Sequence, residues 1–82
     1  MNKALEMIKT FIDGKMEPME FSFALPDLLI EEYDSMMEEN QEATEILNDE
    51  LPDICADYEP GMNPDAFRKK VKAEYEKAIA EM

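Results

Sequence analysis

Carboxylates are the side chains of this sequence best placed to do chemistry. The chain contains 21 Asp and Glu residues against 8 Lys and Arg, no histidine and a single cysteine, Cys55. Carboxylates can act in pairs as acid and base, bind divalent cations, or dock onto a cationic surface. Their spacing and their neighbours decide among these three uses.

The sequence lacks residues that catalysis and metal binding commonly require. Without histidine, the chain has neither the commonest general base nor the commonest transition-metal ligand. No apolar pocket is indicated that would raise the pKa of one carboxylate. A calcium loop needs alternating oxygen ligands, a glycine at its sixth position and a glutamate at its twelfth, and no window has this pattern. We therefore expect no enzyme, no catalytic residue, no metal site and no cofactor.

The acidic residues are concentrated in the middle of the chain. From residue 16 to residue 66 there is no Lys or Arg, whereas Asp and Glu occur sixteen times, and the net charge of the whole chain is -13. This charge repels nucleic acid and anionic membranes and attracts basic surfaces. We expect a basic protein partner, and binding to neither nucleic acid nor membrane.

Apolar periodicity predicts the elements that carry these carboxylates. Apolar residues recur at spacings of three and four over 2–13, 18–39, 41–58 and from Asn63 to Met82. In the second and third of these segments the pattern keeps its phase across a proline, which predicts a kinked helix rather than a broken one. The length suits one domain. We predict an all-α fold, a four-helix antiparallel bundle over residues 1–82 with two proline-kinked central helices.

Within the two central helices, the acids fall opposite the apolar stripe. If the helices pack as neighbours, their carboxylates form a nearly continuous surface. We predict that six of them contact the partner: Glu31, Asp34, Glu38, Glu45, Asp49 and Asp53. The alternative is a solvated face that only keeps the protein in solution.

A second apolar line crosses the segment 18–39, away from its main stripe. Phe23, Ile30 and Met37 repeat every seven residues. In one interpretation this helix is central and touches two neighbours, which buries all three side chains and gives a monomer. In the other, they form an exposed strip that anchors a partner. We expect the first. Cys55 is expected to be a small buried core residue.

The sequence also favours a cytoplasmic protein. Glu6, Lys9 and Asp13 interrupt the apolar run that a signal peptide would need. No segment approaches the ~20 apolar residues of a membrane span. A lone cysteine cannot form an internal disulfide.

Three segments carry a resemblance to a known family: IKTFIDGKMEPMEF at 8–21, LPDICADYEPG at 51–61 and FRKKVKAEYEKA at 67–78. Together they resemble the bacterial self-protective, colicin D-type immunity proteins. The resemblance implies a helical bundle that binds the cytotoxic nuclease domain of a cognate toxin, typically one that cleaves tRNA. It also implies that acidic residues block the basic catalytic cleft of that toxin.

The leading hypothesis is therefore an immunity-type inhibitor that covers the basic active site of a nuclease toxin. The second is an acidic adaptor or regulatory module that binds a basic segment of another protein, as a homodimer formed through Phe23, Ile30 and Met37. A third is a protein that mimics DNA.

Overall fold

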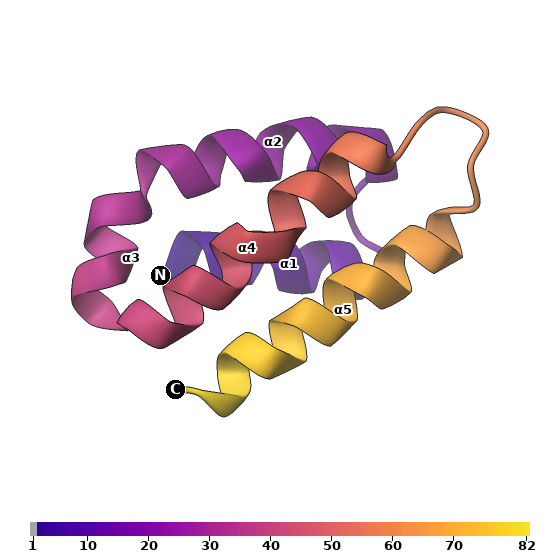
Figure 1. Cartoon of the computed structure of the whole chain (residues 1–82). Helices are drawn as coiled ribbons and strands as arrows, with labels where there is room; N and C mark the ends of the chain where they lie inside the picture. The colour runs from indigo at the N-terminus through magenta and orange to yellow at the C-terminus, as the bar shows by residue number, and fades with distance from the viewer. Residues whose placement is uncertain (1) are drawn as a thin grey trace.

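The chain folds into five helices in a computed structural model that describes residues 2–82. They are α1 (Asn2–Ile12), α2 (Pro18–Glu31), α3 (Tyr33–Glu39), α4 (Gln41–Asp57) and α5 (Pro64–Ala80). In Figure 1, each of the four long helices runs opposite to the long helix before it. The described residues contain no strand, so the all-α prediction is confirmed.

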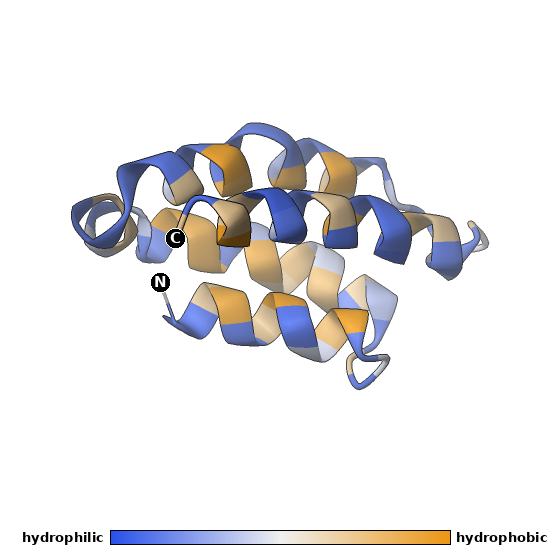
Figure 2. Cartoon of the chain, turned by 90° about the horizontal axis from the view of Figure 1, so that it is seen from below, coloured by the Kyte–Doolittle hydropathy of each residue, from blue (hydrophilic) through white to orange (hydrophobic). Residues whose placement is uncertain are grey.

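The four long helices pack in a closed ring around one core. Helix α1 packs against α2, α2 against α4, α4 against α5, and α5 against α1. Figure 2 shows apolar residues on the sides where helices face one another and polar residues on the outer sides. Each helix contributes side chains to the buried core, which include Ile8, Phe11, Phe21, Leu25, Leu29, Met36, Leu47, Leu51, Phe67 and Val71.

Aromatic side chains from several helices pack together at one end of this closed arrangement of helices. Phe11, near the end of α1, stacks on Phe21 of α2 with ring centroids 4.1 Å apart and planes 8° from parallel. Phe67 of α5 contacts both rings and stacks on Tyr58, which follows α4, with centroids 4.5 Å apart. Arg68 covers the outer face of Phe11 at 5.2 Å and donates a hydrogen bond from Nε to the Phe11 carbonyl.

The four-helix prediction is not confirmed, because the expected helix 18–39 is divided at Glu32 into α2 and α3. A single residue, Asn40, connects α3 to α4. Connections between antiparallel helices usually take about 2–8 residues, so one residue after a long straight helix is too short to reverse the chain. Helix α3 makes the corner instead and buries Met36 against the core.

Both prolines lie inside continuous helices, as predicted. Pro26 is within α2 and Pro52 within α4. Gly14 ends α1 with a φ of 79°, and the Lys15 amide donates to the Thr10 carbonyl in the pattern of a glycine helix stop. Gly61, with a φ of 93°, lies four residues beyond α4, in a turn closed by a hydrogen bond from the Met62 amide to the Glu59 carbonyl.

Two residues that continue the apolar periodicity predicted from Asn63 to Met82 are exposed. Ile79 belongs to the final turn of α5, and Met82 lies beyond the end of that helix. The helical phase was correct for Phe67, Val71 and Ala78, which are buried. Periodicity gives the face of a residue, whereas burial also requires a neighbouring helix that extends as far.

The aromatic cluster predicts a large stability difference between two nearby phenylalanines. Phe21→Ala removes a ring that is fully buried and should lower the free energy of unfolding by about 3–5 kcal/mol. Phe23→Ala is the matched control, since Phe23 is 69% exposed and its loss should change stability by less than about 0.5 kcal/mol. Urea unfolding followed by circular dichroism measures both, and equal losses would contradict this packing.

Candidate functional site

Helix α4 carries the most regular acidic face. Its N-terminus is fixed by Asn40, whose side chain accepts a hydrogen bond from the Ala43 amide at 3.0 Å and donates one to the Glu81 carbonyl at 3.1 Å. One side of the helix is buried through Ala43, Thr44, Leu47, Leu51 and Cys55. The opposite side exposes a run of carboxylates, Glu42, Glu45, Asp49, Asp53 and Asp57. The apolar side therefore determines the direction in which the acids point.

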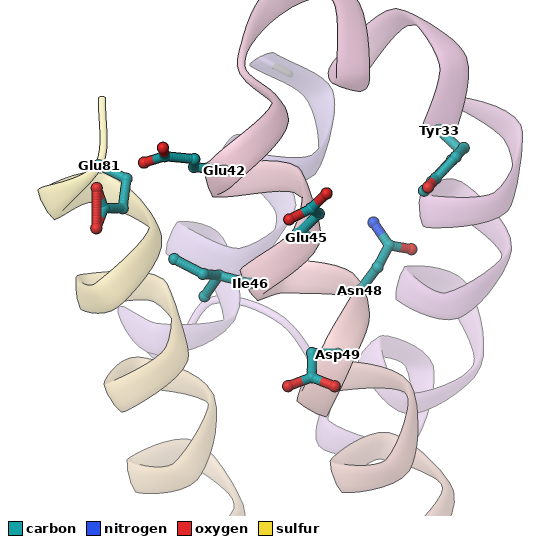
Figure 3. A pocket seen from close by; sticks show the side chains of 7 residues that line it. All are labelled: Tyr33, Glu42, Glu45, Ile46, Asn48, Asp49 and Glu81. Carbon is teal, nitrogen blue, oxygen red and sulfur yellow. The ribbon is translucent and has the colours of Figure 1, made fainter.

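An open hollow of about 610 Å³ lies beside the first half of this face. Figure 3 shows Glu42, Glu45 and Asp49 projecting from α4, with Tyr33 on one side and Glu81 on the other. The three α4 carboxylates come from successive turns of the helix, and Glu81 follows α5. The hollow thus concentrates negative charge where a cationic side chain can reach it from solvent.

All six predicted site residues are exposed. The hollow brings Glu45 and Asp49 together, and Asp53 lies one turn farther along α4. Glu31 ends α2, while Asp34 and Glu38 belong to α3, and none of these three lines the hollow. Sequence reasoning missed Glu81 and Tyr33 as lining residues, because periodicity along one helix does not reveal what other elements contribute.

The ion pairs found within residues 2–82 involve other carboxylates. Lys3 pairs with Glu32 at the α2–α3 corner at 3.4 Å, and Arg68 pairs with Asp65 at 3.0 Å. None of the six predicted carboxylates takes part in an ion pair between residues 2 and 82. Glu45 accepts a hydrogen bond from the neutral Gln41 side chain at 3.1 Å. The acidic face is therefore uncompensated by direct contacts.

Lys77 of α5 interacts electrostatically with this face. Its ammonium group lies 3.0 Å from Glu74. The hydrogen bond and charge of Glu74 raise the pKa of Lys77, and the charges of Glu50 and Asp49 raise it further. The charge of Asp49 is thus within electrostatic range of Lys77.

The acidic run destabilises the helix that carries it. Glu45, Asp49, Asp53 and Asp57 follow one another at intervals of four residues, and all are exposed. Each like-charge pair at this spacing costs roughly 0.2–0.5 kcal/mol. Asp53 and Asp57 also lie near the negative end of the α4 dipole, where anions are unfavourable. A surface selected for stability alone would place cations among these positions.

Replacing one acid in this run is predicted to stabilise the protein. Asp53→Lys converts two repulsive pairs into attractive ones and places a cation near the C-terminus of α4, so the free energy of unfolding should rise by about 0.5–1 kcal/mol. Asp53→Asn should give about half of this gain. Urea unfolding at low salt measures both, and the gain should shrink in about 1 M NaCl. A loss of stability would show that Asp53 has a stabilising partner.

The expected burial of the second apolar line is wrong for two of its three residues. Phe23 is 69% exposed and Ile30 is 76% exposed, while Met37, now on α3, is partly buried. Helix α2 packs on α1 and α4 and buries Phe21, Leu25 and Leu29, whereas Phe23 and Ile30 lie on its exposed side. The strip therefore faces solvent, and the argument for a monomer that rested on its burial no longer applies.

Cys55 is buried, as predicted. Burial disfavours the thiolate and raises the pKa of the thiol from 9.0 to about 12. A thiol with this pKa is a poor nucleophile at neutral pH, because the thiolate is the reactive form. Cys55 therefore acts as a packing residue between α4 and its neighbours.

The raised pKa of Cys55 predicts a loss of stability in alkali. The folded chain keeps the thiol proton to higher pH than the unfolded chain, so stability falls as pH rises above 9.0 towards about 12. The thiol contribution is about 1.4 kcal/mol per pH unit in this window. Urea unfolding from about pH 8 to about pH 11 should show a steeper fall for the parent chain than for Cys55→Ala, and parallel curves would contradict the burial.

Neither a metal site, nor a membrane-spanning helix, nor a similar protein adds a functional assignment. No group of three or more Cys, Asp or Glu residues among residues 2–82 is arranged to hold a metal ion. Within the same range, no helix has the length and apolar character needed to cross a membrane. Comparisons of the chain with protein-family models, curated proteins and solved structures found no match.

Proposed function

We propose that this protein is an inhibitor of immunity type, which binds the basic active site of a cognate nuclease toxin through its acidic face. In this proposal the toxin is a tRNA-cleaving ribonuclease, and the inhibitor acts by excluding the RNA substrate. The inhibitor needs no catalytic residue, metal ion or cofactor. Its contacts come from Glu45, Asp49 and Asp53 on α4, joined by Glu31 of α2 and by Asp34 and Glu38 of α3.

The observation that carries the proposal is the uncompensated acidic face of α4. Its carboxylates are exposed, spaced to repel one another, and free of ion pairs within residues 2–82. A cationic partner converts this unfavourable feature into an attractive interaction. Charge complementarity of this kind chiefly raises the association rate and disfavours wrong partners. Both properties suit an inhibitor that must capture a toxic enzyme quickly.

A nuclease is the kind of basic partner that such a face fits best. A nuclease binds a polyanion, so the cleft that holds its substrate presents Lys and Arg to phosphate groups. Carboxylates on successive helical turns lie about 5–6 Å apart, which is comparable to the spacing of phosphates along a nucleic-acid strand. The short segments that resemble colicin D-type immunity proteins support the same assignment.

A second function is favoured by the exposed strip on α2. An acidic adaptor that binds a basic segment of a protein other than a toxin would also use exposed Phe23 and Ile30 as apolar contacts. The two functions differ in genetic context. An immunity protein should be encoded directly downstream of a long toxin-like gene, and an adaptor has no such constraint.

Charge reversal on α4 tests the proposed function. Asp49→Lys/Asp53→Lys should abolish protection of cells that co-express the adjacent toxin-like gene. Binding kinetics with the purified toxin domain should show an association rate about tenfold slower at low salt and a shallower salt dependence. Thermal melts should show a folded protein, since both side chains are exposed and face away from the core.

A matched control separates local recognition from total charge. Glu6→Lys/Glu76→Lys produces the same change in net charge at exposed positions of α1 and α5 and should retain protection. Full protection by the Asp49 and Asp53 double variant with unaltered kinetics would remove α4 from the interface. Absence of any nuclease activity in the adjacent gene product would refute the immunity assignment itself.

A further inference from the structure

A second hollow, separate from the acidic one, lies between α2 and α4. It has a volume of about 310 Å³ and is lined mainly by apolar groups. We refer to it as the α2–α4 groove, defined by Phe23, Pro26, Asp27, Pro52, Ala56 and Tyr58. Both interior prolines thus face the same groove. Their ring atoms, together with Phe23 and Tyr58, give it walls on which an apolar side chain can pack.

Pro26 leaves one backbone acceptor of α2 without its usual helical donor. Pro26 has no N–H, so the Ser22 carbonyl lacks the donor that residue i+4 normally provides. Ser22 lines the groove, and its own hydroxyl donates to the Met19 carbonyl at 2.8 Å. The Ser22 hydroxyl is thus already engaged within α2, so the groove offers a ligand chiefly its apolar walls.

An exposed strip extends the groove along α2. Phe23, Pro26, Asp27 and Ile30 stand at positions i, i+3, i+4 and i+7, which places them on one side of the helix. Phe23 and Ile30 are the most exposed large apolar side chains among the described residues. The strip covers two helical turns, about 10 Å, which matches the spacing at which a partner helix presents its own apolar residues.

The charges around the groove identify the kind of partner that fits it. Asp27 is part of the lining, and Asp53 and Asp57 are exposed beside Pro52 and Ala56. No Lys or Arg lines the groove, and none occurs between residues 16 and 66. An apolar surface bounded only by carboxylates complements an apolar side chain flanked by cations.

The same charges disfavour a second copy of this chain. A symmetric dimer through the strip would place identical surfaces face to face, so Asp27 and its acidic neighbours would approach their own counterparts. Each copy also carries a net charge of -13. Like charges brought together at an interface oppose association, which makes the homodimer the poorer use of this surface.

We propose that the α2–α4 groove anchors a cationic amphipathic helix of the partner. One apolar side chain of that helix packs between Pro26 and Pro52, its neighbours contact Phe23 and Ile30, and its Lys or Arg residues face Asp27. The cationic character of the partner rests on the proposed function. The location of the anchor and the helical form of the ligand rest on the groove and the exposed strip.

Selection of peptides against the native protein tests the proposal. The probe is a displayed library of helical 16-residue peptides with all residue types allowed on the exposed positions. Selected sequences should carry apolar residues at i, i+3 or i+4, and i+7, with Lys or Arg between them. Fluorescence anisotropy should show binding weakened about tenfold or more by Phe23→Ser and by Ile30→Ser, and the variants should melt like the parent chain.

Met62→Ser is the matched control, because Met62 is an exposed methionine that does not line the groove, and it should leave binding unchanged. Asp27→Lys should weaken cationic peptides while leaving the fold intact. Failure to enrich cationic amphipathic sequences, or binding insensitive to Phe23 and Ile30, would overturn the proposal. So would a dimer, detected by light scattering, that Ile30→Glu dissociates, since that assigns the strip to a second copy.

The outcomes for this anchor and for the proposed function are distinguishable. Peptide binding that depends on Phe23, in a protein that gives no protection against the adjacent gene product, retains the anchor and rejects the immunity function. Protection that depends on Asp49 and Asp53 but not on Phe23 or Ile30 retains the immunity function and rejects the anchor.

Discussion

The arrangement of the helices depends on the stacked aromatic rings at the end of the molecule where α1 connects to α2 and α4 connects to α5. Phe11, Phe21 and Phe67 bring α1, α2 and α5 together, and Tyr58 attaches the end of α4 to Phe67. Each aromatic pair contributes about 0.5–1.5 kcal/mol beyond its buried area. Repulsion within the α4 carboxylates amounts to a few tenths of a kcal/mol per pair. Burial of rings and of the apolar side of α4 therefore outweighs the acidic surface.

The cations that form ion pairs within residues 2–82 bind carboxylates outside the acidic face of α4. Lys3 of α1 reaches Glu32 at the α2–α3 corner, Arg68 pairs with Asp65 within α5, and Lys77 pairs with Glu74. Of these pairs, only Lys3–Glu32 joins different helices, as does the hydrogen bond from Asn40 at the start of α4 to the Glu81 carbonyl. None of these contacts covers the outer side of α4. Stabilising contacts and exposed charge are thus separated in space.

The sequence alone was sufficient to predict features that arise within one helix. It was insufficient to predict features that depend on which helices pack together. Periodicity predicted helices continuous through Pro26 and Pro52 and the exposure of all six candidate carboxylates. The break at Glu32 was missed because no residue there disfavours a helix; the one-residue connection to α4 imposes it. Exposure of Ile30 and the approach of Glu81 to α4 depend on which helices become neighbours, a property that no local spacing contains.

In the proposed function, the two surfaces of the molecule have complementary physical roles in recognition. Carboxylates such as Glu45 and Asp49 act at the range of the screening length, about 8 Å at physiological salt, and so influence the rate at which a cationic partner arrives. Apolar contacts at Phe23 and Ile30 act only after water has been excluded, and so influence how long the partner stays. Since α2 and α4 pack directly on each other, the two surfaces lie on neighbouring helices. This combination favours a partner that is both cationic and amphipathic. A purely basic partner surface would lack the apolar contacts, and a purely apolar one would lack the electrostatic attraction that speeds association.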